Sequence, residues 1–117
     1  MGRLTEQKKR RLNRIHVYLT QNYMTPFPTT LVILGKAIDK KVLGTTSKSK
    51  RRIYIAIDGT MEQSRAIETL VHEYAHAMTW TYQSIEDVRP HHCPEWGLAY
   101  ARVYQDLWED GGLEMIK

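Results

Sequence analysis

The stretch TLVHEYAHAMTW, residues 69–80, contains the pattern that most constrains how this chain folds. His72 and His76 are four positions apart, and Glu73 directly follows the first histidine. Side chains four residues apart lie on the same side of a helix, with Cβ atoms about 5–6 Å apart, so both imidazoles can reach one metal ion. Glu73 lies about 100° further round the helix, where it can contact a water on that ion more easily than the ion itself. The pattern therefore predicts a zinc-binding helix that also carries a general base.

The neighbouring residues predict which side of this helix faces the core. Apolar side chains recur at helical spacing, at Ile67, Leu70, Val71, Tyr74 and Met78. The two histidines and Glu73 fall on the other side, which disfavours a core or surface helix with incidental histidines. Thr60 followed by Gln63 matches a capping box, so the helix is expected to begin there.

The residues before this helix predict one helix, one strand and a hairpin. LTEQKKRRLNRIHVYLTQNY, residues 4–23, spaces its apolar side chains along one side of a helix, and Pro26 and Pro28 prevent its continuation. TLVILG, residues 30–35, is typical of a short strand. Residues 36–59 predict a hairpin, with TTSKSK at 45–50 as the exposed turn and Ile53, Ile55 and Ile57 alternating along the second strand.

Proline is favoured at the first position of a helix, so PEWGLAYARVYQDLWED, residues 94–110, is expected to be the last helix. Its packing stripe is expected to comprise Trp96, Ala99, Tyr100, Val103, Tyr104 and Leu107. The expected fold class is α+β, with an N-terminal helix, a small three-stranded sheet, the histidine helix and a C-terminal helix. The length of 117 residues predicts one domain, residues 1–117.

Composition limits the compartment and the kind of site. A single cysteine, Cys93, excludes an internal disulfide and a cysteine-based zinc cluster within the chain. No apolar run approaches the roughly 20 residues of a membrane span, and the N-terminus has no signal-peptide core. The expectation is a soluble cytoplasmic protein, or one of the host cytoplasm if a phage encodes it.

A catalytic zinc needs a third protein ligand and one open position for water. The downstream candidates are His91, His92 and Glu95. His92 lies just before the expected start of the last helix, where the helix dipole is positive and favours the neutral, ligating form of a histidine. These residues leave the choice of the third ligand open.

LVHEYAHAM at 70–78, followed by HHCPEWGLAYARVY at 91–104, resembles the SprT-like (Spartan-related) zinc metallopeptidases. Their pattern is H-E-x-x-H, a loop, and then H-G-x-x-F/W opening another helix, with Cys93 here in place of the usual glycine. The resemblance covers most of the chain and implies a minimal zincin-like catalytic core without the Cys-rich zinc ribbon of many bacterial members, a size common in phage-encoded versions. It implies one Zn²⁺ per chain held by His72, His76 and His92, with Glu73 as the catalytic base.

The function expected from this resemblance is a zinc-dependent endopeptidase acting on a protein substrate. Tyr100, Tyr82 and His91 are candidates for steadying the oxyanion of the scissile carbonyl. In similar enzymes an edge strand pairs with the substrate backbone, which here would be the Ile53–Ile57 strand or its hairpin partner.

Charge is divided unevenly along the chain. Residues 1–52 contain 13 Lys and Arg against two acids, a net charge of +11, whereas residues 53–117 contain 4 against 11, a net charge of −7. The basic half is either a solvated surface or a non-specific DNA contact. The DNA contact would use Lys8, Lys9, Arg10, Arg11, Arg14, Lys48, Lys50, Arg51 and Arg52, and possible targets of the enzyme are then DNA-associated proteins. The alternative function is a nucleic-acid-binding module with a structural zinc and no proteolysis.

Overall fold

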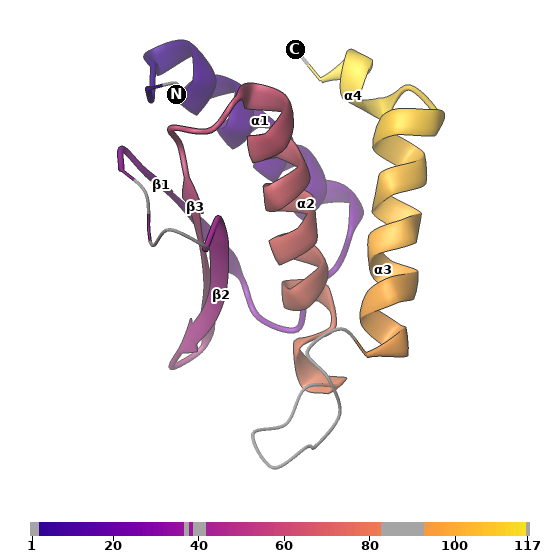
Figure 1. Ribbon diagram of the computed structural model, residues 1–117. Helices are drawn as coiled ribbons and strands as arrows, with labels where there is room; N and C mark the ends of the chain where they lie inside the picture. Colours follow the sequence, from indigo (N-terminus) through magenta and orange to yellow (C-terminus); the bar gives the residue numbers. More distant parts are fainter. Residues whose placement is uncertain (1–2, 37, 39–41, 83–92, 117) are drawn as a thin grey trace.

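A three-stranded mixed sheet lies at one side of the molecule in the computed structural model, which describes residues 3–36, 38, 42–82 and 93–116 (Figure 1). The central strand is β3 (Arg52–Asp58). It pairs in parallel with β1 (Thr29–Leu34) and antiparallel with β2 (Gly44–Ser49). The alternating isoleucines of β3, Ile53, Ile55 and Ile57, are all fully buried on one face. The α+β class and the small sheet expected from the sequence are therefore confirmed.

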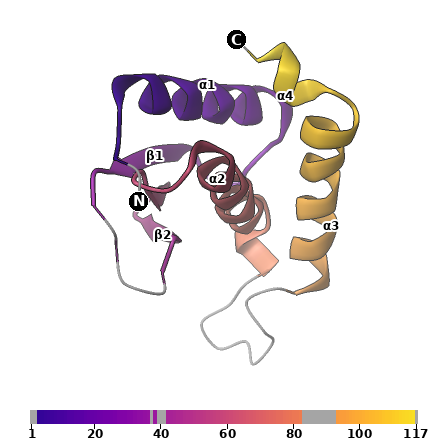
Figure 2. The ribbon, with the colours of Figure 1, turned by 45° about the horizontal axis from the view of Figure 1, so that its top comes forward.

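Two helices cover this buried face of the sheet (Figure 2). They are α1 (Glu6–Asn22) and α2 (Gln63–Met78). The hydroxyl of Tyr74 on α2 is buried between them and donates to the backbone oxygens of Leu19, at 3.2 Å, and Tyr23, at 2.8 Å. Burial of Tyr74 raises the pKa of its hydroxyl to about 12, so it remains a donor at neutral pH. These two contacts join α2 to the end of α1.

The hairpin formed by β2 and β3 has a longer first strand and a shorter turn than the sequence predicted. Residues 45–50, expected as an exposed turn, instead contribute most of β2, and the reversal takes place at Lys50 and Arg51. Lys50 has a positive φ of 55°, which closes the turn. The prediction was wrong because polar Thr and Ser side chains indicate a turn by composition, whereas threonine also fits an edge strand well.

The start of α2 also differs from the expectation. Its N-cap is Glu62, and no side chain caps it, so the capping box predicted at Thr60 is wrong. The hydroxyl and backbone N–H of Thr60 donate instead to the Asp58 carboxylate, at 2.6 and 2.9 Å. The Asp58 carboxylate thus orients Thr60 toward the end of β3, and the helix begins three residues later.

The last helix begins at Pro94 as predicted and then changes its winding. It comprises α3 (Pro94–Tyr104), a π-helical segment η2 (Gln105–Glu109) and, after a break, α4 (Gly112–Met115). The short 3₁₀ helix η1 (Trp80–Tyr82) follows α2. Among the described residues, no helix is both long and apolar enough to cross a bilayer.

Asp106, in η2, joins the C-terminal segment to the end of α1. Its carboxylate accepts hydrogen bonds from the hydroxyls of Tyr18, at 2.8 Å, and Tyr23, at 2.6 Å. Burial, and then the hydrogen bond to Asp106, raise the pKa of Tyr23, so this hydroxyl stays protonated. These two bonds fasten α3 in place beside α2, where it forms one side of the candidate site.

Candidate metal centre and cleft

The two histidines of α2 lie as the helical spacing predicts. The ring centroids of His72 and His76 are 5.1 Å apart, and the ring planes are inclined at 66°. His76 is 9% exposed, while His72 is partly exposed. Two imidazoles this close on one helix face fit two of the four positions around a tetrahedral zinc ion. Burial lowers the pKa of His72, which favours the neutral form that a metal requires.

Trp96, at the start of α3, contacts both histidines. Its ring centroid lies 5.0 Å from that of His72 and 5.4 Å from that of His76. Its indole N–H donates to the backbone oxygen of His72 at 3.2 Å. The sequence indicated only a packing residue here, although a Phe or Trp occurs at this point of the H-G-x-x-F/W pattern. Trp96 therefore packs against both imidazole rings.

Glu73 lies beside the histidines and is held by a residue that the sequence did not indicate. The Thr46 hydroxyl on β2 donates to Glu73 Oε1 at 2.6 Å. The other carboxylate oxygen, Oε2, is 3.9 Å from Nε2 of His72. The two carboxylate oxygens of Glu73 therefore have different surroundings. Oε1 accepts from Thr46 on β2, and Oε2 lies on the side of His72. Thr46 was missed because its segment was expected to form a turn.

Gly44 permits the close approach of β2 to Glu73. A Cβ atom at this position would lie 2.8 Å from Cγ2 of Thr69, which is shorter than real contacts, and 3.0 Å from Cγ of Glu73, which is tight. The absence of a side chain lets the start of β2 pack directly on α2. The glycine therefore sets the distance across which Thr46 reaches Glu73.

A cleft of about 1170 Å³ follows α2 and is lined by Gly44, Thr46, Glu73 and both histidines. β2 and the residues just before it form one wall, and Tyr100 of α3 lies on the other side. Trp80, Arg65 and Glu68 complete the lining. A cleft of this volume is open enough to admit an extended chain, since ligand pockets typically measure about 300–1000 Å³.

Among the described residues, only one of the two strands considered for substrate pairing lies at an edge of the sheet. β3 has a neighbour on both sides, so the Ile53–Ile57 strand cannot add another strand. β2 is at the sheet edge and lines the cleft. An edge strand presents backbone N–H and C=O groups that a peptide can pair with.

Two of the three candidates for the third metal ligand lie outside the described residues. His91 and His92 lie there, and so does the side chain of Tyr82. Within residues 3–36, 38, 42–82 and 93–116, no three His, Cys, Asp or Glu side chains are placed to hold one metal ion. Glu95 therefore does not complete the His72–His76 pair. The choice between His91 and His92 stays a prediction.

Tyr100 is the oxyanion candidate that the structure places in the cleft. Burial, followed by the nearby charge of Glu68 and then Tyr104, raises its pKa, so the phenol remains a hydrogen-bond donor at neutral pH. Its ring centroid lies 6.3 Å from that of His72. A neutral phenol at this position is chemically suited to donate to a developing negative charge.

Comparison with known proteins agrees with this geometry. The family model described as the SprT-like family matches residues 9–113. This match spans every strand, α2, α3 and most of α1. No curated protein and no solved structure matches the chain.

Proposed function

The chain belongs to the SprT-like family, and from this premise we propose that it is a zinc-dependent endopeptidase whose general base is Glu73. His72, His76 and His92 would hold the metal. The observation that carries the proposal is the Glu73 carboxylate, held by Thr46 at 2.6 Å beside a histidine pair with ring centroids 5.1 Å apart. A purely structural zinc site has no need of a positioned base.

Bound zinc would lower the pKa of a water toward about 7 and polarise the substrate carbonyl. The protein's own residues supply the proton transfers. Thr46 holds Oε1 of Glu73, so Oε2, on the His72 side, is the atom that takes the proton from the attacking water. The same carboxyl then delivers that proton to the leaving amine, whose bond to the carbonyl carbon breaks.

Substrate binding in this proposal uses main-chain contacts. The free edge of β2 pairs with an extended peptide over α2, which positions the scissile carbonyl near the histidines. Because backbone pairing ignores side chains, we expect weak sequence preference. Tyr100 donates to the carbonyl oxygen as negative charge develops there.

The decisive experiment combines activity with metal content. Glu73→Gln keeps the shape of the side chain and can still accept from Thr46, but its amide cannot accept a proton. The variant should retain zinc and fold, while hydrolysis of an unstructured protein such as casein falls by at least about 10²-fold. Equal hydrolysis by the variant would remove this mechanism, and an inactive wild-type protein with full zinc would favour the non-proteolytic alternative.

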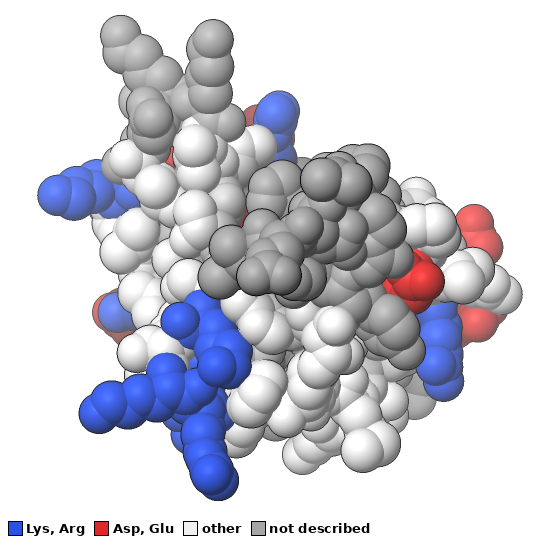
Figure 3. Space-filling view, turned by 90° about the horizontal axis from the view of Figure 1, so that it is seen from below, with Lys and Arg blue, Asp and Glu red and all other residues white. Residues whose placement is uncertain are grey.

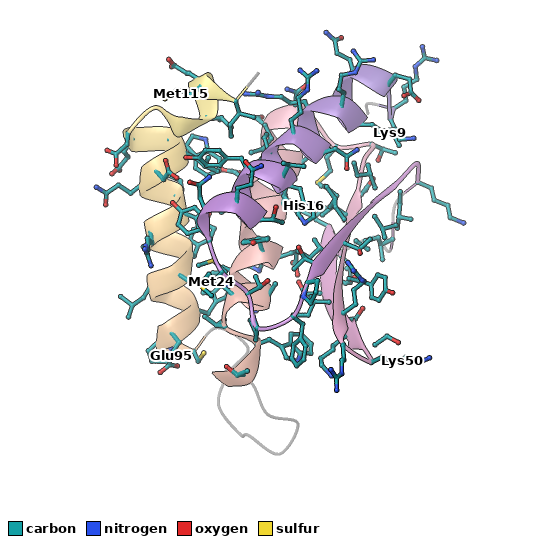
Figure 4. All side chains as sticks on the ribbon, turned by 180° about the vertical axis from the view of Figure 1, so that it is seen from behind. Lys9, His16, Met24, Lys50, Glu95 and Met115 are labelled. Atoms are coloured by element: carbon teal, nitrogen blue, oxygen red, sulfur yellow. The ribbon has the colours of Figure 1, made fainter. Side chains whose placement is uncertain are left out.

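The basic half of the chain supports a second part of the proposal, a non-specific DNA contact. Its charges are separated in space, because Figure 4 shows Lys9 and Lys50 at opposite ends of the molecule. Figure 3 shows Lys and Arg side chains gathered at the side where Figure 1 places the β2–β3 turn. We name this the hairpin patch; it comprises Lys48, Lys50, Arg51 and Arg52, all exposed.

Several basic residues of α1 have structural roles, which weakens that helix as a DNA contact. Lys8 Nζ donates to the backbone oxygen of Met61 at 2.9 Å, and Arg11 donates to those of Leu113 and Ile116. Lys9 lies 3.9 Å from the Glu6 carboxylate. Arg10 and Arg14 remain exposed. In the hairpin patch, Lys48 lies over the Phe27 ring and Arg52 donates to the Thr30 hydroxyl at 2.8 Å. We therefore assign the DNA contact first to Lys50 and Arg51, at the turn that continues from the β2 wall of the cleft, and only secondarily to α1.

A further inference from the structure

Four aromatic side chains form a continuous stack along the C-terminal helix. We call Trp96, Tyr100, Tyr104 and Trp108 the aromatic stripe; they are spaced four residues apart. Consecutive ring centroids are 5.1, 6.1 and 4.8 Å apart, with interplanar angles of 12°, 39° and 25°. The core of this helix is formed by other residues, Ala99, Val103 and Leu107, which are buried. Tyr100 and Trp108 also pack partly against the core, whereas Tyr104 is an exposed large hydrophobic side chain.

The π-helical segment keeps the stack aligned. In a regular α-helix, a step of four residues turns about 40° past a full revolution, so a stack at this spacing drifts round the helix. The π-helical segment η2 has more residues per turn than an α-helix, as shown by the hydrogen bond from Asp110 N–H to the Gln105 oxygen at 2.8 Å. Four residues in this segment therefore turn through a smaller angle. Trp108 therefore remains stacked on Tyr104. π-Helical turns occur frequently at functional sites.

The stripe is continuous with the cleft. Trp96 contacts both histidines, Tyr100 lines the cleft, and Tyr104 is 38% exposed. Twelve residues of helix separate the first ring from the last, a length of about 18 Å. An extended peptide covers this length with about five residues. A chain paired with β2 over α2 would present its other side to these rings.

We propose that the aromatic stripe is the second wall of the substrate cleft and binds an extended, unfolded polypeptide through its aromatic and proline side chains. The inference rests on the proposed peptidase function and adds to it a preference for particular substrate side chains. The rings of the stripe can stack on aromatic and proline side chains of a substrate, whereas β2 forms hydrogen bonds only with the substrate backbone. The enzyme should therefore favour substrates with such residues on one side of the scissile bond.

Charge favours a polypeptide over a nucleic acid as the occupant. Among the described residues, Glu68 and Glu73 line the cleft together with Tyr100, against a single arginine, Arg65. The half of the chain that contains the stripe has a net charge of −7. This acidic balance of the cleft lining disfavours phosphates more than a neutral or basic peptide.

Binding can be measured without turnover. Two labelled peptides of about ten residues, one with Tyr and Pro at alternate positions and one with Ser at the same positions, are titrated into zinc-loaded Glu73→Gln protein by fluorescence anisotropy. The Tyr/Pro peptide should bind several-fold more tightly. Adding Tyr104→Ala should reduce this preference by about 2- to 10-fold, the range expected for one aromatic pair.

Leu98→Ala is the matched control, because Leu98 is 75% exposed on the same helix and outside the stripe. It should leave the preference unchanged. Equal affinity for both peptides, or an equal loss in Leu98→Ala, would overturn the inference even if the wild-type protein cleaves casein. Conversely, a Tyr104-dependent preference in a protein without hydrolytic activity would support the stripe and contradict only the peptidase mechanism.

Two other occupants have distinct outcomes. A dimer that Tyr104→Ala abolishes in sedimentation experiments, without any peptide preference, would assign the stripe to a second copy. Competition by a single-stranded oligonucleotide that weakens with salt and depends on Tyr104 would assign it to nucleic acid. Either result overturns the polypeptide assignment.

Discussion

Thr46 and Glu73 are 27 residues apart in sequence, yet the threonine hydroxyl donates to the glutamate carboxylate at 2.6 Å. Glu73 is only 8% exposed, so few other orientations are open to its side chain. A hydrogen bond to a charged, buried group contributes about 1.5–3 kcal/mol. Thr46 is therefore a positioning residue for the proposed base, and β2 connects the sheet directly to the chemistry.

The first prediction concerns this bond. Thr46→Val keeps the branched shape and removes the donor, so Glu73 Oε1 loses this hydrogen bond. We expect kcat to fall by about 10-fold or more, with KM and zinc content nearly unchanged, because β2 can still pair with substrate. Thr46→Ser restores the hydroxyl and should recover most of kcat. Steady-state kinetics with zinc analysis decide it, and a valine variant with wild-type kcat would leave Thr46 without a positioning role.

The second prediction concerns the metal ligands. His72→Ala and His76→Ala should each abolish stoichiometric zinc binding, because two remaining ligands do not hold a zinc site. His92→Ala should do nearly the same, and His91→Ala serves as its matched control and should retain one zinc. Metal analysis of the four purified variants is the measurement. Full zinc in His92→Ala together with loss in His91→Ala would move the third ligand by one residue.

The third prediction concerns pH and His16, which lies away from the cleft. Its Nε2 is 2.8 Å from the Thr29 hydroxyl, and its ring packs edge-on against Tyr74. Burial lowers the pKa of His16 below 6.5. The unfolded chain therefore binds this proton at a higher pH than the folded chain. The contribution of His16 to stability is complete above pH 6.5 and declines as the pH falls below it.

Urea unfolding of the metal-free protein at pH 7.5 and pH 5.5 tests this sign. The wild type should lose more stability between these pH values than His16→Gln, whose side chain keeps a polar contact and does not titrate. The metal-free protein is used so that zinc release from the other histidines does not contribute. Equal losses in the two proteins would show that His16 has no part in the pH dependence.

The fourth prediction compares the two basic regions. If the hairpin patch binds DNA, reversing Lys50 and Arg51 to Glu should weaken binding and flatten its salt dependence, because fewer phosphates are neutralised. Reversing Arg10 and Arg14, at the other end of the molecule, is the charge-matched control and should have a smaller effect. Gel-shift titrations at two salt concentrations measure both. Absence of DNA binding by the wild type at low salt would leave these residues as a solvated surface.

Much of the candidate site was predictable because it depends on local periodicity. The i, i+4 spacing of His72 and His76, the adjacent Glu73 and the opposed apolar stripe of α2 all follow from 3.6 residues per turn. The alternation of Ile53, Ile55 and Ile57 likewise predicted a buried strand face, and Pro94 predicted the start of α3. A repeating pattern within one segment predicts its secondary structure and its buried face, whichever elements that segment packs against in the fold.

Only the tertiary structure decided which residues support that pattern. Thr46 reaches Glu73 because the sheet order places β2 at the edge beside α2, and Gly44 allows the close approach. Trp96 reaches both histidines because α3 packs against α2, where its indole N–H donates to the backbone oxygen of His72. Such contacts join segments far apart in the sequence, and no periodicity within a segment specifies its neighbours. The helix that carries the proposed chemistry was therefore evident from the sequence, whereas the side chains that orient its histidines and its base depended on how the separate elements pack around it.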